Sequence, residues 1–191
     1  MNLPQKIENK IKEEAIKFLE KGKPDWDIPH TLTAVYWMKE LIKKEGGNEK
    51  ILIPAMYIHD TGYPILKKGY NYEDLMISKK SHAERGGENA KNILSKFKIF
   101  TNSEIEEIVY LIKNHDIHNN LETKNRQLVF EADTLAQIDW EKVPPNFDKE
   151  NFTIWLDKYF FGKRKAPERI KTETGKKFLK KLMAGVDKYL K

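Results

Sequence analysis

Apolar residues recur at the spacing of an α-helix along almost the whole chain. Residues three and four positions apart lie on one face of a helix, so each such stripe predicts a helix that buries this face against its neighbours. No two alternating apolar runs are joined by a turn, as a β-hairpin would require. The chain is therefore expected to be all-α. The stripes predict helices over residues 7–19, 32–42, 51–58, 78–97, 103–114 and 126–139.

Capping and turn-forming residues predict where these helices begin and end. Ser103 precedes Glu106 by three positions, the spacing of a capping box, and predicts the start of a helix. Pro54 fits a helix if it lies in the first turn, where its missing N–H has no partner to lose. The predicted helix ends fall at Gly22, Gly46, Gly47, Gly62, Pro144 and Pro145.

Pro144 and Pro145 also mark the expected boundary between a domain over residues 1–143 and an extension over residues 144–191. The net charge of the whole chain is +6, but residues 158–191 hold 12 Lys and Arg against 3 Asp and Glu, which leaves −3 for residues 1–157. The extension ends in a basic amphipathic helix, which we expect to pack on the domain rather than on a membrane or nucleic acid. The run 163–165 is expected to edge the mouth of the functional site and attract anions.

The composition excludes several classes of protein. The chain contains no cysteine, so it forms no disulfide, no thiolate nucleophile and no cysteine-ligated metal site. No uncharged apolar run approaches the ~18–20 residues of a membrane span, and charges replace the apolar core of a signal peptide near the N-terminus. A cytoplasmic protein without a membrane partner is expected. Any metal must be held by histidine and carboxylate ligands.

Histidine and aspartate form an ordered series along the chain. Two of the five histidines are followed directly by aspartate, in the pairs 59–60 and 115–116. Asp133 interrupts an otherwise apolar stretch, and a buried carboxylate needs a cation or hydrogen-bonding partners. The first four histidines are expected at or near helix ends or first turns, where side chains from separate helices converge. We therefore predict a metal site and interpret the fifth, His118, as an ordinary core residue. The series is His30, His59, Asp60, His82, His115 and Asp133.

This order on a helical chain resembles the HD-domain superfamily of metal-dependent phosphohydrolases, over residues 28–140. The resemblance implies an HD-domain helical bundle with a basic helical appendage at its C-terminus. It implies a first divalent ion held by His30, His59, Asp60 and Asp133. In dinuclear members, two further histidines at positions like His82 and His115 bind a second ion, and the aspartate of the first pair bridges both ions.

The residue types themselves suit this chemistry. Imidazole and carboxylate ligands together suit Mn, Fe, Co, Ni or Zn better than Ca. The expected cofactor is one or two divalent ions, of Mn, Fe, Co, Ni, Zn or Mg. Two ions ~3.5–4 Å apart activate water and stabilise the attacking and leaving oxygens in a displacement at phosphorus. The expected function is a metal-dependent phosphohydrolase that cleaves a phosphoester, in a nucleotide or another small phosphate compound. Asp60 and Asp116 are the expected catalytic residues.

The role of Asp116 has three readings: a general acid for the leaving group, a ligand of the second ion, or an acceptor that orients a histidine. A turn residue bonding its own backbone is the structural alternative. Some members of the resembled superfamily have a lysine or glutamate three residues after the first aspartate, where this chain has Tyr63. Substrate contacts are therefore assigned to other cations. The predicted substrate-binding residues are Lys80, Arg85 and Lys113, with Lys67 and Lys79 as alternatives.

Two other functions fit the same residues. A site of six histidine and aspartate ligands on this scaffold also resembles the mixed-valent di-iron oxygenases, which would need molecular oxygen. A binding module with a structural metal and a basic tail for nucleic acid is the other alternative. Because residues 1–157 carry a net negative charge, nucleic acid is not the expected partner. The expected partner is a small phosphorylated substrate, and the oligomeric state is open.

Overall fold

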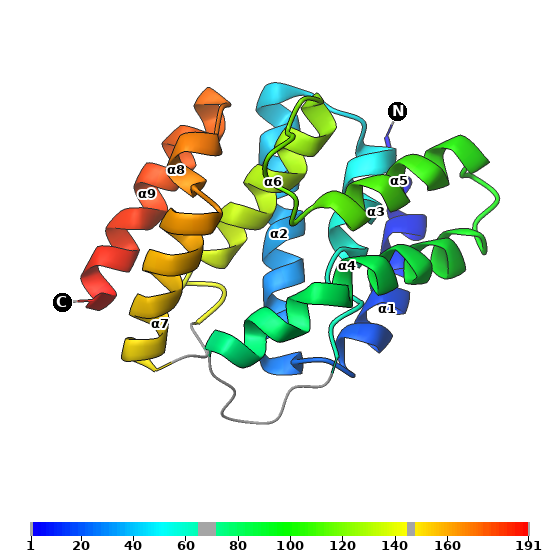
Figure 1. Cartoon of the computed structure of the whole chain (residues 1–191). Coiled ribbons are helices and arrows are strands. Elements are labelled where there is room, and N and C mark those ends of the chain that lie inside the picture. Colours follow the sequence, from blue (N-terminus) through cyan, green and yellow to red (C-terminus); the bar gives the residue numbers. More distant parts are fainter. Residues whose placement is uncertain (1, 65–71, 145–147, 191) are drawn as a thin grey trace.

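The computed structural model describes residues 2–64, 72–144 and 148–190 (Figure 1). It confirms the all-α prediction, because these residues form helices and no strand. None of the described helices has the length and apolar character that a membrane crossing requires. The helices are α1 (Gln5–Leu19), α2 (Pro24–Glu45), α3 (Glu49–Ile58), α4 (Tyr72–Leu94), α5 (Asn102–Asn114), α6 (Lys124–Gln137), α7 (Lys149–Trp155), the π-helix η1 (Leu156–Lys163), α8 (Ala166–Arg169) and α9 (Glu173–Leu190).

Helix α3 lies at the centre of the bundle. Its residues 51–58 are all buried, so the helix is apolar on every face, as expected for a helix enclosed by others. Helices α1, α2, α4, α5 and α6 each pack against it. His59 and Asp60 follow its last residue directly. The central helix therefore delivers these two side chains into the interior of the bundle.

The C-terminal segment packs against the helices that precede it. Helix α9 contacts α6 and α2 and buries Leu179 and Val186. The ring of Tyr189 lies 4.7 Å from that of Trp140, measured between centroids. Figure 1 shows α7, α8 and α9 together on the α6 side of the bundle, away from α1. The apolar residues of this segment join the same core as those of α1 to α6. The division at residues 143 and 144 into two units stays a prediction.

Pro54 lies further into its helix than predicted. It is the sixth residue of α3, in the second turn of the helix, so the expectation of a first-turn proline is wrong. A proline at this position offers no N–H to the carbonyl of Lys50 four residues earlier. The complete burial of residues 51–58 explains why the helix continues, since tertiary packing supplies most of the stability of a protein helix.

The capping box of α5 also lies elsewhere than predicted. The backbone N–H of Glu104 donates to the Thr101 hydroxyl at 3.2 Å, and the Thr101 N–H donates to the Glu104 carboxylate at 2.8 Å. Thr101 and Glu104 have the same three-residue spacing as Ser103 and Glu106. Spacing alone does not separate two overlapping pairs, and the helix begins at the earlier one.

Replacing Thr101 with alanine is expected to lower the free energy of unfolding by ~1 kcal/mol, because the first turn of α5 loses its cap. Ser103 is exposed in the same turn and makes the matched control. The variant Ser103→Ala is expected to change the free energy of unfolding by less than ~0.5 kcal/mol. Urea denaturation monitored by circular dichroism measures both values, and equal losses would contradict the assignment.

Candidate metal centre

Five helices bring the predicted ligands to one place. His59 and Asp60 follow α3, and His115 with Asp116 follows α5, so these pairs do stand at helix ends. The corresponding expectation is wrong for the remaining two histidines. The ligands that project from within helices are His30 of α2, His82 of α4 and Asp133 of α6. All six predicted ligands are buried and lie in one cluster at the core of the bundle.

One half of the cluster is built around His30 and His59. Their Nε2 atoms lie 3.3 Å apart. The Oδ2 atom of Asp60 lies 3.4 Å from the first of these nitrogens and 3.3 Å from the second. The Oδ1 atom of Asp133 lies 3.0 and 3.7 Å from the same two nitrogens. Two imidazoles and two carboxylates therefore point at a common centre.

The other half is built around His82 and His115. Their Nε2 atoms lie 3.1 Å apart, and the Oδ1 atom of Asp60 lies 3.5 and 3.4 Å from them. The Oδ2 atom of Asp116 lies 3.4 Å from the His82 nitrogen. The two carboxylate oxygens of Asp60 thus face two different pairs of histidines. This is the arrangement of a carboxylate that can bridge two cations.

The hydrogen bonds of the rings show that this donor set fits metal ions. The Nδ1 atoms of His82 and His115 donate to the backbone carbonyls of Lys79 and Ile112, at 2.8 and 2.6 Å. A carbonyl cannot donate, so Nδ1 carries the proton and Nε2 presents a lone pair when the ring is neutral. Burial and the neighbouring His115 lower the pKa of His82 to about 3. Two lone pairs that face each other at 3.1 Å can share a cation, and this backbone bond is the usual support of a metal-bound histidine.

The carboxylates of the cluster are ionised. Burial opposes ionisation of Asp60, but His59 and His115 beside it hold its pKa well below its usual range. Burial likewise opposes ionisation of Asp133, and Arg164 with His30 holds its pKa well below the usual range. Both side chains are therefore available as anionic ligands.

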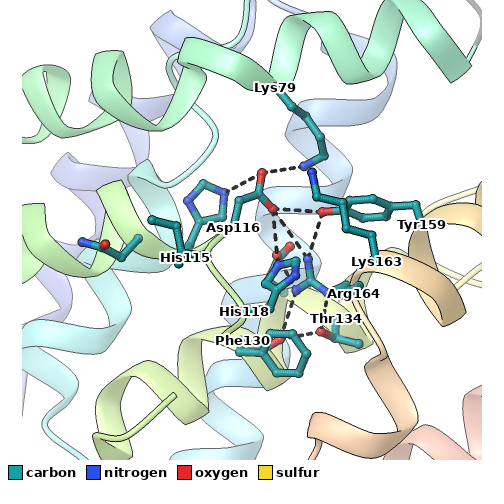
Figure 2. Close-up of polar contacts among 12 residues, drawn as sticks. Lys79, His115, Asp116, His118, Phe130, Thr134, Tyr159, Lys163 and Arg164 are labelled. Carbon is teal, nitrogen blue, oxygen red and sulfur yellow. Dashed lines mark hydrogen bonds and ion pairs between the residues drawn. The ribbon is translucent and has the colours of Figure 1, made fainter. Parts of the chain in front are cut away.

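Asp116 lies in a network of polar contacts at the edge of the cluster (Figure 2). The Lys79 ammonium donates to its Oδ2 atom at 2.7 Å, and the Tyr159 hydroxyl donates to Oδ1 at 3.0 Å. Burial opposes its ionisation, but Lys79 and His115 hold its pKa well below the usual range. Asp116 is thus a carboxylate that accepts hydrogen bonds. Its side chain is 20% exposed, against 8% for Asp60 and 3% for Asp133, so solvent reaches the cluster from this side.

The predicted substrate-binding cations make other contacts. Arg85 donates through Nε to the carbonyl of Gly62 at 2.7 Å and braces the turn that follows Asp60. Lys113 forms an ion pair with Glu84 at 2.5 Å, in which both side chains are partly exposed. These contacts do not bring either cation into the ligand cluster, and their role with substrate stays a prediction. The side chain of Lys80 and all of Lys67 lie outside the described residues. Lys79, one of the alternatives, is the lysine beside Asp116.

Arg164 corrects the expectation for the basic run at residues 163–165. Its side chain is completely buried, whereas both neighbouring lysines are exposed. It cannot attract anions from solvent, and it donates to Asp133 at 2.8 Å instead. The signal in the sequence was its residue type, because arginine suits a buried ion pair better than the lysines on either side do. Tyr159 was also missed in the sequence, because an aromatic side chain by itself predicts packing in the core.

The prediction that His118 is an ordinary core residue is only partly correct. It is buried and packs edge-on against Phe130, with ring centroids 5.3 Å apart. Its Nε2 atom lies 3.8 Å from Oδ1 of Asp116 and has no hydrogen-bond partner. Burial and the nearby Arg164 lower its pKa to about 4, so the ring is neutral at pH 7. His118 therefore borders the cluster on the side of Asp116.

Comparison with known proteins yields one structural relative. No family model and no curated protein matches the chain. Among solved structures, the chain is similar to a crystal structure described as a predicted HD superfamily hydrolase from an uncultured Thermotogales bacterium. The TM-score is 0.62 and the sequence identity 22%, over 99% of this chain and 90% of the other. At this identity the likeness concerns the fold. It covers the C-terminal segment as well as the helices before it.

Proposed function

Because this chain has the all-helical fold of the HD superfamily, we propose that it is a metal-dependent hydrolase, and specifically a phosphohydrolase. The observation that carries this proposal is the position of Asp60. Its Oδ2 atom faces the pair of His30 and His59, and its Oδ1 atom faces the pair of His82 and His115. One side chain thereby joins two sets of histidine ligands, as a dinuclear centre requires.

The proposal gives each ligand a place. The first ion would be held by His30, His59, Asp60 and Asp133, and the second by Asp60, His82 and His115 with Asp116 beside it. When bound, such ions supply Lewis acidity and lower the pKa of water.

The remaining chemistry belongs to Asp116. As a carboxylate held by Lys79 and Tyr159, it would accept a hydrogen bond from the attacking water and orient it. The general acid role is disfavoured, because a carboxylate must be protonated before it can donate and the pKa of Asp116 is held well below its usual range.

The charge of the site favours an anionic substrate. Three carboxylates, those of Asp60, Asp116 and Asp133, surround the cluster with two cations, Lys79 and Arg164. These groups leave one net negative charge, which two divalent ions would convert to three net positive charges. A phosphate ester supplies the negative charge that such a site needs. We therefore propose a nucleotide or another small phosphorylated compound as the substrate.

Elemental analysis of protein purified without chelator is expected to find one or two divalent ions per chain. The same preparation is expected to hydrolyse at least one compound in a panel of phosphomonoesters, cyclic nucleotides and dinucleoside polyphosphates, with equal rates in air and under argon. Removal of the metal with a chelator should abolish this activity, and re-addition should restore it.

Two results would contradict the proposed hydrolase and indicate one of the two alternative functions. Turnover that requires oxygen, with iron as the bound metal, would indicate a di-iron oxygenase. Salt-dependent binding of nucleic acid without any hydrolysis would indicate a binding module, since such binding weakens steeply as counterions are added.

A further inference from the structure

Arg164 is the buried cation closest to the ligands of the first half of the cluster. Its Nη2 atom donates to Oδ2 of Asp133 at 2.8 Å and to the Phe130 carbonyl at 3.3 Å, while Nε donates to the Thr134 hydroxyl at 2.8 Å. These three partners all belong to α6, and Figure 2 shows Phe130 and Thr134 beside Arg164. The guanidinium is thus fixed in a single orientation on the helix that carries Asp133.

The same guanidinium also faces the second half of the cluster. Its Nη1 atom lies 3.5 Å from the Tyr159 hydroxyl and 3.8 Å from Oδ1 of Asp116. Asp133 belongs to α6, Asp116 follows α5, and Arg164 faces both carboxylates. One side chain from the C-terminal segment therefore touches an acidic residue on each side of the cluster.

The backbone that delivers Arg164 is unusual. Residues 156–163 form a π-helix, and the Arg164 N–H bonds to the carbonyl of Tyr159 five positions earlier, at 2.7 Å. This winding brings residues five apart to the same side, so Tyr159 and Arg164 both reach the cluster. Lys165 then takes a left-handed conformation with φ of 48°, which is uncommon for a residue other than glycine. Long π-helices are rare, and short ones are frequent at functional sites.

Asp133 uses its two oxygens for different partners. Oδ1 faces His30 and His59 and also accepts from the Gln137 amide at 3.2 Å, whereas Oδ2 is occupied by Arg164. We propose that Arg164 is a positioning residue of the metal centre, which restricts Asp133 to one ligand oxygen and makes the C-terminal segment part of the centre. This inference rests on the proposed function, because it assumes an ion between the first pair of histidines.

A lysine cannot replace this arginine. The planar guanidinium bonds Asp133, Thr134 and the Phe130 carbonyl at once, whereas an ammonium is a point charge on a flexible stem. Loss of a partner that orients a metal ligand typically costs ~10–100-fold in metal affinity. Arg164→Lys is therefore expected to raise the dissociation constant for Mn²⁺ by at least ~10-fold, and Arg164→Met by at least as much.

The test measures Mn²⁺ binding by electron paramagnetic resonance of the free ion, on full-length protein whose folding is checked by circular dichroism. Visible spectra of Co²⁺-loaded protein should differ between the wild type and Arg164→Lys, because the released Oδ2 changes the coordination. The control is Lys165→Met, which removes a neighbouring exposed charge and should bind Mn²⁺ nearly as the wild type does. Thr134→Val removes one of the bonds that orient the guanidinium and none to Asp133, so it should lose less Mn²⁺ affinity than Arg164→Lys.

Each outcome decides the inference. If Arg164→Met does not fold, Arg164→Lys, which keeps the charge, carries the test. A folded Arg164→Lys protein with wild-type Mn²⁺ affinity and Co²⁺ spectrum would overturn this inference and leave the proposed function standing. An equal loss of affinity in Lys165→Met would overturn it too, since it would show that the effect is not specific to the guanidinium. If the wild type binds neither ion, the proposed function fails together with the inference.

Discussion

The variant Asp60→Ala is expected to lose both bound metal and hydrolytic activity. Asp60 is the residue that faces both pairs of histidines, so its removal takes one ligand from each half of the cluster. Loss of a ligand should exceed the ~10–100-fold in affinity that loss of an outer partner costs. Metal content after gel filtration, measured by mass spectrometry, and the rate of phosphoester hydrolysis check this result.

The matched control for Asp60 is Asp139. Asp139 is also buried, but its carboxylate accepts from the indole of Trp37 at 3.1 Å and from Lys142 at 2.7 Å. Asp139→Ala should lower the free energy of unfolding and leave the metal content per folded chain unchanged. Comparison of the two variants separates loss of a buried carboxylate from loss of a ligand. An Asp60→Ala protein with full metal content and activity would rule out the assigned site.

The period of the apolar residues predicted the class of fold, because an α-helix must bury one face whatever its neighbours are. The ligands are different, since helical spacing does not show which faces meet. His30 and His82 project from within long helices, and only the order of residue types, read through a resemblance, placed them with His59 and His115. Tertiary packing decides which helix faces contact each other, and a single sequence shows this packing only indirectly.

Lys79 and Arg164 show where sequence reasoning stops. Adjacent residues on an α-helix point ~100° apart, so only the packing of α4 decides that Lys79 faces the cluster. The number of residues per turn itself changes before Arg164, because residues 156–163 form a π-helix. A prediction that assumes 3.6 residues per turn therefore places the Arg164 side chain on the wrong face of this helix.

The second large effect is expected at Gly62, in the turn between Asp60 and α4. A Cβ atom there would lie 2.0 Å from the carbonyl oxygen of His82 and 2.6 Å from the nitrogen of Gly86. Both atoms belong to the backbone of α4, so no side-chain rotation relieves the contact. Gly62→Ala must move the turn away from α4, which separates Asp60 from His82. We expect a loss in the free energy of unfolding above the ~1–3 kcal/mol of ordinary overpacking, and weaker metal binding.

Gly185 in α9 is the matched control, because a Cβ atom added there would have no contact within 4 Å. Gly185→Ala is expected to raise the free energy of unfolding by ~0.5–1 kcal/mol, since alanine loses less backbone entropy than glycine in a helix. Urea denaturation of the metal-free proteins measures both changes without a contribution from bound ions. The same glycine-to-alanine change would then lower the free energy of unfolding at Gly62 and raise it at Gly185. This difference would show that close packing of the turn against α4, and not helix propensity, sets the position of Asp60. A Gly62→Ala protein as stable as the wild type would contradict that packing.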